Sequence, residues 1–192
     1  MKRQKRALFA LTIFLISILL FTSCRRGSPL RTGSWNDDIF TNTWTNITFE
    51  LPAEFWAVDS PGDTFGQVTD FHLIHDAGGT SISMTYIDVT SQNDTAEDYL
   101  NMMREQMANH SGRTRLFPDY FESTTIAGRE FLVMRTKFFQ DDNPNEIFFQ
   151  DAYVHRFVGT MLLLLITFSS DTADSVASFT SSIHQIQERV YS

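Results

Sequence analysis

The chain has 192 residues, of which 42% are hydrophobic and 20% charged, and its formal net charge is −8. This length suits one domain with appendages, and the composition is that of a globular chain rather than a disordered one. The first 23 residues carry four basic residues and no acid, so the remainder carries −12. Such an acidic body disfavours nucleic acid as a partner, because it is repelled by phosphate backbones.

The first 23 residues have the three parts of a bacterial signal peptide. Met1–Arg6 is basic, Ala7–Phe21 is apolar, and the small residues Thr22 and Ser23 precede Cys24. The apolar run has the length of a signal-peptide core and is short for a helix that spans a bilayer. Cys24 is the only cysteine, which excludes an intramolecular disulfide and a thiolate metal cage.

The stretch LFTSC, which ends at Cys24, resembles a bacterial lipobox, with Phe21 standing where Leu, Ile or Val is usual. The resemblance implies that Cys24 is lipidated and becomes the mature N-terminus, so that membrane lipid is one partner of the protein. The alternative is an uncleaved signal anchor. Both alternatives predict a membrane-anchored protein whose residues from Arg25 onward face the extracytoplasmic side, because the basic end stays in the cytoplasm.

Composition divides the rest of the chain into a flexible tether at residues 24–38 and one domain at residues 39–192. The segment Arg25–Asp38 is rich in Gly, Ser, Pro and Arg, which is typical of a linker. From Ile39 the pattern changes to strands. Alternating apolar residues predict a hairpin of Ile39–Trp44 with Ile47–Leu51, and a second hairpin of Phe71–His75 with Thr80–Val89.

A helix is predicted from Thr95, with Asp98 as its capping-box partner and with Leu100, Met103 and Met107 on one face. Ser111 and Gly112 end it. Four further strands and a closing helix are predicted: Tyr120–Ile126, Glu130–Gln140, Ile147–Arg156, Met161–Phe168, and a helix with Asp171 as its cap and Val176, Phe179, Ile183 and Ile186 as its buried face.

The segment Met161–Ile166 is apolar at every position, which predicts a central strand covered on both faces. Two helices with one apolar face each, around an antiparallel meander, predict an α+β fold in which helices sandwich an antiparallel sheet.

No catalytic, phosphate-binding or metal-binding motif occurs in the sequence, so we expect no cofactor, no metal and no enzymatic activity. Asp70, His72 and Asp76 would share one face of a regular strand and could hold zinc or orient an imidazole. The alternative, which we favour, is a set of ordinary polar residues on the wet face of an edge strand. The oxygen-rich stretch Asp141–Glu146 lacks calcium-loop spacing and favours a hairpin loop.

Aromatic residues crowd the start of the domain. Four of them are candidates for an exposed binding patch: Trp35, Phe40, Trp44 and Trp56. Aromatic side chains at this density usually fill a core, and only an exposed subset would mark a binding surface.

The aromatic–x–Asn strand, the second strand that ends in proline and the following Trp resemble the start of PsbP/Mog-type domains of small bacterial lipoproteins. The residues that carry this resemblance are Trp35, Phe40, Asn42, Trp44, Ile47, Phe49, Leu51, Pro52 and Trp56. The order of the later elements is similar over Ile39–Gln187, although Phe55 stands where a Gly often precedes the Trp. The resemblance implies an α/β/α sandwich with an antiparallel sheet, and it implies accessory binding proteins rather than an enzyme class.

Two functions follow as hypotheses. The first is a non-enzymatic accessory or protein-binding module of the cell envelope, with a partner protein of unknown identity. The second is a small-ligand carrier or sensor with a pocket between the sheet and one helix.

Overall fold

The computed structural model describes residues 32–58, 67–89, 95–109, 113–140, 143–157 and 159–185. Cys24 and the segment before it lie outside these ranges, so the lipid anchor stays a prediction. Within them, no helix has the length and apolar character needed to cross a bilayer.

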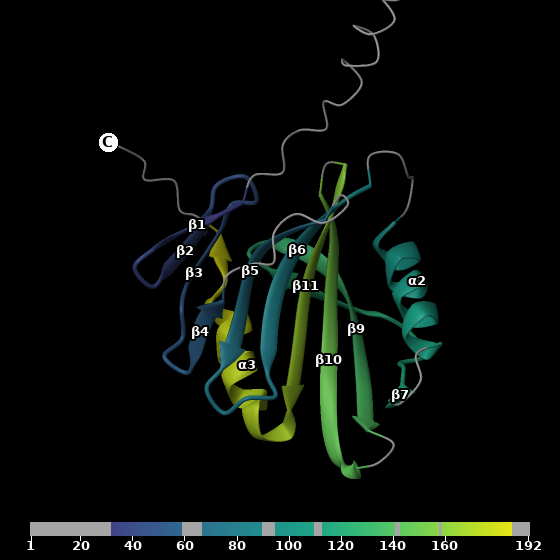
Figure 1. Cartoon of the computed structure of the whole chain (residues 1–192). Helices are drawn as coiled ribbons and strands as arrows, with labels where there is room; N and C mark the ends of the chain where they lie inside the picture. The colour runs from purple at the N-terminus through teal and green to yellow at the C-terminus, as the bar shows by residue number, and fades with distance from the viewer. Residues whose placement is uncertain are drawn as a thin grey trace, which may run out of the picture. The chain divides into compact units, whose positions relative to one another are not determined.

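The described residues form two antiparallel sheets and two α-helices (Figure 1). The smaller sheet has the strand order β1-β2-β3-β12: β1 Ser34–Asn36, β2 Ile39–Asn42, β3 Ile47–Glu50 and β12 His184–Gln185. The larger sheet has the order β4-β5-β6-β11-β10-β9-β7, and β8 also pairs with β9. Its strands are β4 Phe55–Val58, β5 Gln67–His75, β6 Ser81–Asp88, β7 Arg113–Leu116, β8 Glu122–Ile126, β9 Arg129–Gln140, β10 Asn143–Phe157 and β11 Thr160–Ser169.

The predicted hairpins are confirmed, and each turn has a local reason. β2 pairs with β3 around Asn46, which adopts a positive φ of 55°. β8 pairs with β9 through Ala127 and Gly128, whose φ angles of 48° and 70° suit a two-residue turn that matches strand twist. β9 pairs with β10 in antiparallel register, and Asn143–Glu146, predicted as part of a loop, belong to β10 instead. Asp141 and Asp142 lie outside the described residues.

β11 is the central strand that its sequence predicts. It lies between β6 and β10 in the larger sheet, and the side chains of Met161, Leu162 and Leu164 are almost fully buried. Alternate residues of β11 reach the two faces of the sheet, so both faces must be covered.

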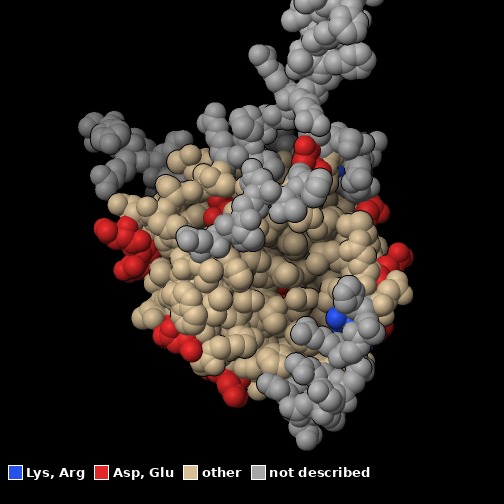
Figure 2. Space-filling model, viewed as in Figure 1, with Lys and Arg blue, Asp and Glu red and all other residues tan. Residues whose placement is uncertain are grey.

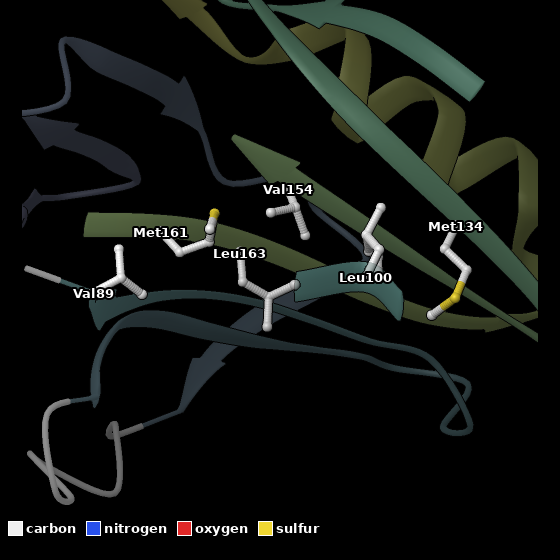
Figure 3. Packing of buried hydrophobic residues seen from close by; sticks show 7 residues of the cluster. Val89, Leu100, Met134, Val154, Met161 and Leu163 are labelled. Carbon is white, nitrogen blue, oxygen red and sulfur yellow. The ribbon is translucent and has the colours of Figure 1, made fainter. Parts of the chain in front are cut away.

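One face of the larger sheet packs against α2 (Ala96–Ala108). Leu100 is fully buried there within a cluster from β9, β10 and β11 (Figure 3). The cluster contains Val89, Leu100, Met134, Ala152, Val154, Met161 and Leu163. The predicted capping box is present: Thr95 Oγ1 accepts from the Asp98 backbone N–H at 3.1 Å, and the Asp98 carboxylate accepts from the Thr95 N–H at 2.9 Å.

The opposite face packs against α3 (Ala173–Ser182) and the smaller sheet. Phe179 of α3 contacts Phe49 of β3, with ring centroids 5.1 Å apart, and Phe71 of β5 at 6.4 Å. The structure therefore confirms a large antiparallel sheet with two helices. The layer on this face differs from the expected helical layer, because the smaller sheet shares it with α3.

Two boundaries differ from the sequence-based expectation. β1 begins at Ser34 and pairs with β2, so folded residues extend into the range predicted as tether. At the closing helix, Asp171 lies in a 3-10 turn, η1 (Ser170–Thr172), and Thr172 is the N-terminal cap of α3 instead. Val176, Phe179 and Ile183 are buried as predicted, and Ile186 lies outside the described residues.

Candidate functional site

The four aromatic residues proposed as a patch do not form one exposed surface. Phe40 is fully buried, so its assignment to an exposed patch is wrong. Trp35 is half-buried, with its ring 5.2 Å from that of Phe40. Trp44 is half-buried between Tyr86 and the end of β10. Trp56 is 43% exposed on β4, an edge strand of the larger sheet.

Other large hydrophobic side chains are exposed, but they lie on separate elements. They are Ile39, Met102, Leu116, Tyr120 and Ile147. β4 and β7, which carry Trp56 and Leu116, are at opposite edges of the larger sheet. Figure 2 shows one face of the molecule, where uncharged residues fill the centre and acidic side chains lie around its edge.

The expected shared face of Asp70, His72 and Asp76 is not formed. The pairing of β5 with β6 shifts between Thr69 and Phe71, so Asp70 is the extra residue of a β-bulge. Asp70 and Phe71 both face the smaller sheet as a result, and His72 lies on the other face of β5. Asp76 is exposed in the turn after the strand.

Asp70 instead belongs to a buried polar network between the two sheets. Its carboxylate accepts hydrogen bonds from the Tyr86 hydroxyl, the Gly33 backbone N–H and Asn42 Nδ2, the last at 3.0 Å. Asn42 Oδ1 in turn accepts from the backbone N–H groups of Trp44 and Thr45. Every polar group of this Asp70–Asn42–Tyr86 network thus has a partner, which is typical of a structural network.

The ionisation of the network follows from its burial. Burial raises the pKa of Asp70, and the hydrogen bonds from Tyr86, Gly33 and Asn42 oppose that shift. Burial and the neighbouring Asp70 carboxylate raise the pKa of Tyr86, so the phenol stays protonated and remains a donor. Among the described residues, no group of three or more His, Cys, Asp or Glu side chains could hold a metal ion.

A hollow of about 310 Å³ lies between α2 and the segment that leads into β8. We call it the α2 hollow, and its lining residues are Glu97, Asn101, Arg104, Asp119, Tyr120, Phe121 and Leu132. Glu97, Asn101 and Arg104 lie on one face of α2, because side chains at i, i+4 and i+7 of a helix lie above one another. Half-buried Leu132 and Phe121 also pack against the core cluster beneath, so the floor of the hollow is apolar.

The charged groups of the α2 hollow differ in how they are satisfied. Arg104 Nη2 donates to Asn101 Oδ1 at 2.7 Å, and the Arg104 guanidinium lies 5.5 Å from the centre of the Phe121 ring. Glu97 and Asp119 are exposed, and neither carboxylate has a hydrogen bond or ion pair anywhere in the described ranges. Tyr120, at 73% exposure, has the most exposed large hydrophobic side chain among the described residues.

The sequence contained a signal for this hollow that the prediction did not use. Glu97, Asn101 and Arg104 form a polar stripe beside the apolar face of the helix. Tyr120 and Phe121 fall in a predicted strand, whereas β8 begins at Glu122 in the structure. Their proximity depends on how the segment after β7 returns toward α2, and helical spacing does not specify that path.

A second, smaller hollow of about 210 Å³ lies where β8, β10 and α3 meet. It is lined mostly by hydroxyl groups: Thr124, Thr125, Ile126, Tyr153, Thr180 and Ser181. Thr180 and Ser181 donate to the carbonyl of Ala177, and Tyr153 donates to Asp151. Much of its hydrogen-bonding capacity is therefore used within the fold.

No family model matches the sequence. No curated protein matches it either. The solution structure of cyanobacterial PsbP (CyanoP) from Synechocystis sp. PCC 6803 is similar to this chain, with a TM-score of 0.53 and 18% sequence identity. The similarity covers 83% of this chain and 95% of the CyanoP chain. The domain has a PsbP-like fold. This confirms the PsbP/Mog-type resemblance at the level of an α+β fold with a large antiparallel sheet and two helices, and at this identity the likeness concerns the fold alone.

Two further solved structures have lower TM-scores of 0.46 and 10% identity. One is LpqN of Mycobacterium tuberculosis, described as involved in cell envelope biogenesis, which covers 72% of this chain and 82% of its own. The other is the Ran-binding protein Mog1p of Saccharomyces cerevisiae, which covers 80% of this chain and 97% of its own.

Proposed function

We propose that the protein is a non-enzymatic accessory module of the cell envelope, anchored through Cys24, that binds a partner protein at the α2 hollow. The observation that carries the proposal is the position of Tyr120. This ring is largely exposed at a hollow with an apolar floor. Exposed tyrosines are typical anchors of protein interfaces, because the ring adds contact area and its hydroxyl can hydrogen-bond.

The lining of the α2 hollow supports binding rather than catalysis. It contains no histidine, cysteine or serine, so a nucleophilic serine or cysteine beside a histidine base does not occur there. Its two carboxylates, of Glu97 and Asp119, are exposed and therefore accessible to a partner.

The test is site-specific photo-cross-linking in native membranes. A photo-reactive phenylalanine analogue replaces Tyr120 in the full-length protein. The matched control carries the same analogue at Trp56, which is also exposed but lies on the far edge strand β4. We expect a discrete cross-linked partner from position 120 and none from position 56. The absence of a cross-link at position 120, or the same products at both positions, would refute the proposal.

A second function, a small-ligand carrier or sensor, is favoured by one observation. The α2 hollow lies between α2 and Leu132 of β9 and has a volume of about 310 Å³, at the low end of the range for ligand sites. A small molecule that raises the midpoint of thermal unfolding of the wild type but not of Phe121→Ala, relative to each unliganded protein, would support this function.

A further inference from the structure

We infer that the α2 hollow recognises a basic side chain, lysine or arginine, presented by the partner protein. This inference rests on the proposed function and names the chemistry of the contact. It starts from an imbalance in the hollow. Two carboxylates line it and have no ion-pair partner in the described part of the chain, while its one cation is already engaged.

The engagement of Arg104 matters because it removes the internal partner for those carboxylates. Its guanidinium donates to Asn101 and lies over the Phe121 ring, and it forms no ion pair with Glu97 or Asp119. An incoming cation would therefore supply the opposite charge that Glu97 and Asp119 lack. It would also be drawn toward the acidic body of the protein.

The apolar surfaces of the hollow suit the rest of such a side chain. Lysine and arginine carry a charged head on an aliphatic stem, and the stem packs on apolar surface while the head remains near water. Phe121 and Leu132 provide the apolar floor, and the Tyr120 ring provides an exposed aromatic surface. An ammonium or guanidinium group over such a ring gains a further cation–π attraction.

The same observations disfavour two other ligand classes. An anionic group would meet two carboxylates and only one cation, which is already hydrogen-bonded. A calcium ion held by protein ligands alone would need more oxygen ligands than the two carboxylates and Asn101 supply, because calcium takes six to eight. No set of three metal-ligating side chains occurs in the described ranges.

The test measures binding of a defined probe to the full-length protein in detergent micelles. The probe is Nα-acetyl-lysine methylamide, and its neutral counterpart carries an acetylated Nε. Ligand-detected saturation-transfer NMR compares the two probes on the wild type and on Glu97→Gln/Asp119→Asn. The control, Glu54→Gln/Glu105→Gln, removes the same amount of charge at exposed positions outside the hollow.

We expect the charged probe to give a stronger signal than the neutral probe on the wild type. The signal of the charged probe should fall about threefold or more in Glu97→Gln/Asp119→Asn, since two exposed ion pairs are lost. In the control variant, Glu54→Gln/Glu105→Gln, it should equal the wild-type signal. Equal signals from both probes would overturn the inference. An equal fall in both double variants would also overturn it, because net charge alone would then explain the binding.

The cross-link from position 120 separates this inference from the proposed function. In Glu97→Gln/Asp119→Asn the partner cross-link should weaken. If it persists at wild-type yield, the partner binds without the carboxylates, so the basic-side-chain inference fails while the proposed function stands. If the wild type gives no cross-link at this position, the proposed function itself fails.

Discussion

The Tyr86 hydroxyl donates a hydrogen bond to the Asp70 carboxylate in the buried layer between the two sheets. The same hydroxyl accepts from Asn42 Nδ2 at 2.9 Å. Tyr86 belongs to β6 of the larger sheet and Asn42 to β2 of the smaller one. The Asp70–Asn42–Tyr86 network thus joins the two sheets with polar contacts inside an otherwise aromatic layer.

Tyr86→Phe should destabilise the domain by about 1–3 kcal/mol, because Asp70 loses a donor and Asn42 loses an acceptor in a buried site. Urea denaturation measures the free energy of unfolding. Tyr99→Phe is the control, since the Tyr99 hydroxyl makes no hydrogen bond within the described ranges. Equal effects of the two substitutions would contradict a special role for the Tyr86 hydroxyl.

The raised pKa of Asp70 predicts how stability depends on pH. Because the folded state holds the proton more tightly than the unfolded state, Asp70 is most favourable to folding at low pH. Its contribution falls as pH rises from the unfolded value, about 3.9, through the raised folded value. Urea denaturation between about pH 3.5 and 7 should show the stability of wild type falling relative to Asp70→Asn as pH rises. If the free energy of unfolding of wild type minus that of Asp70→Asn stays constant or rises with pH, burial does not dominate the pKa shift of Asp70.

Thr95→Ala should destabilise α2 by removing its N-terminal cap, at a typical cost of about 1 kcal/mol. The hydrogen bonds with Thr95 lower the pKa of Asp98, so this stabilisation is present above the unfolded pKa and is lost as pH falls through the folded value. The penalty of Thr95→Ala should therefore be larger at pH 7 than at pH 3. An equal penalty at both pH values would mean that the Asp98 carboxylate contributes nothing to the cap.

Leu100→Ala should cost about 2–5 kcal/mol, because it opens a cavity where α2 meets β9, β10 and β11. Met102→Ala on the same helix is the control, since Met102 is 43% exposed and should change stability little. Thermal unfolding distinguishes the two variants. If Met102→Ala is as damaging as Leu100→Ala, the assignment of the buried face of α2 is wrong.

The sequence predicted the regular parts of the fold because their signals are local. Two such signals depend only on residues that are neighbours in the sequence. They are the capping pair Thr95 and Asp98 and the apolar run Met161–Ile166. Asp70 shows where such reasoning fails. Strict alternation along a strand would place Asp70 on the same face of β5 as His72, but the bulge places them on opposite faces. The bulge depends on how β5 pairs with β6, which the identity of Asp70 does not reveal.

The candidate site was less predictable than the fold for the same reason. Phe40 and Trp56 are both aromatic residues near the start of the domain, yet one is fully buried and the other is 43% exposed. The difference is their place in the sheets, since Phe40 faces Phe71 across the interior and Trp56 lies on an edge strand. The α2 hollow required tertiary contacts between Arg104 and Phe121 that residue spacing does not encode.

The early start of the smaller sheet limits the distance between the domain and the lipid anchor that the sequence predicts at Cys24. The Gly33 backbone N–H is bound to Asp70, and nine residues, from Cys24 to Thr32, separate Gly33 from the start of the predicted mature chain. Fully extended, nine residues span at most about 30 Å. If Cys24 is lipidated as the sequence predicts, chain length alone keeps Gly33 within about 30 Å of the anchor, and a partner of the proposed site must be reachable within that distance.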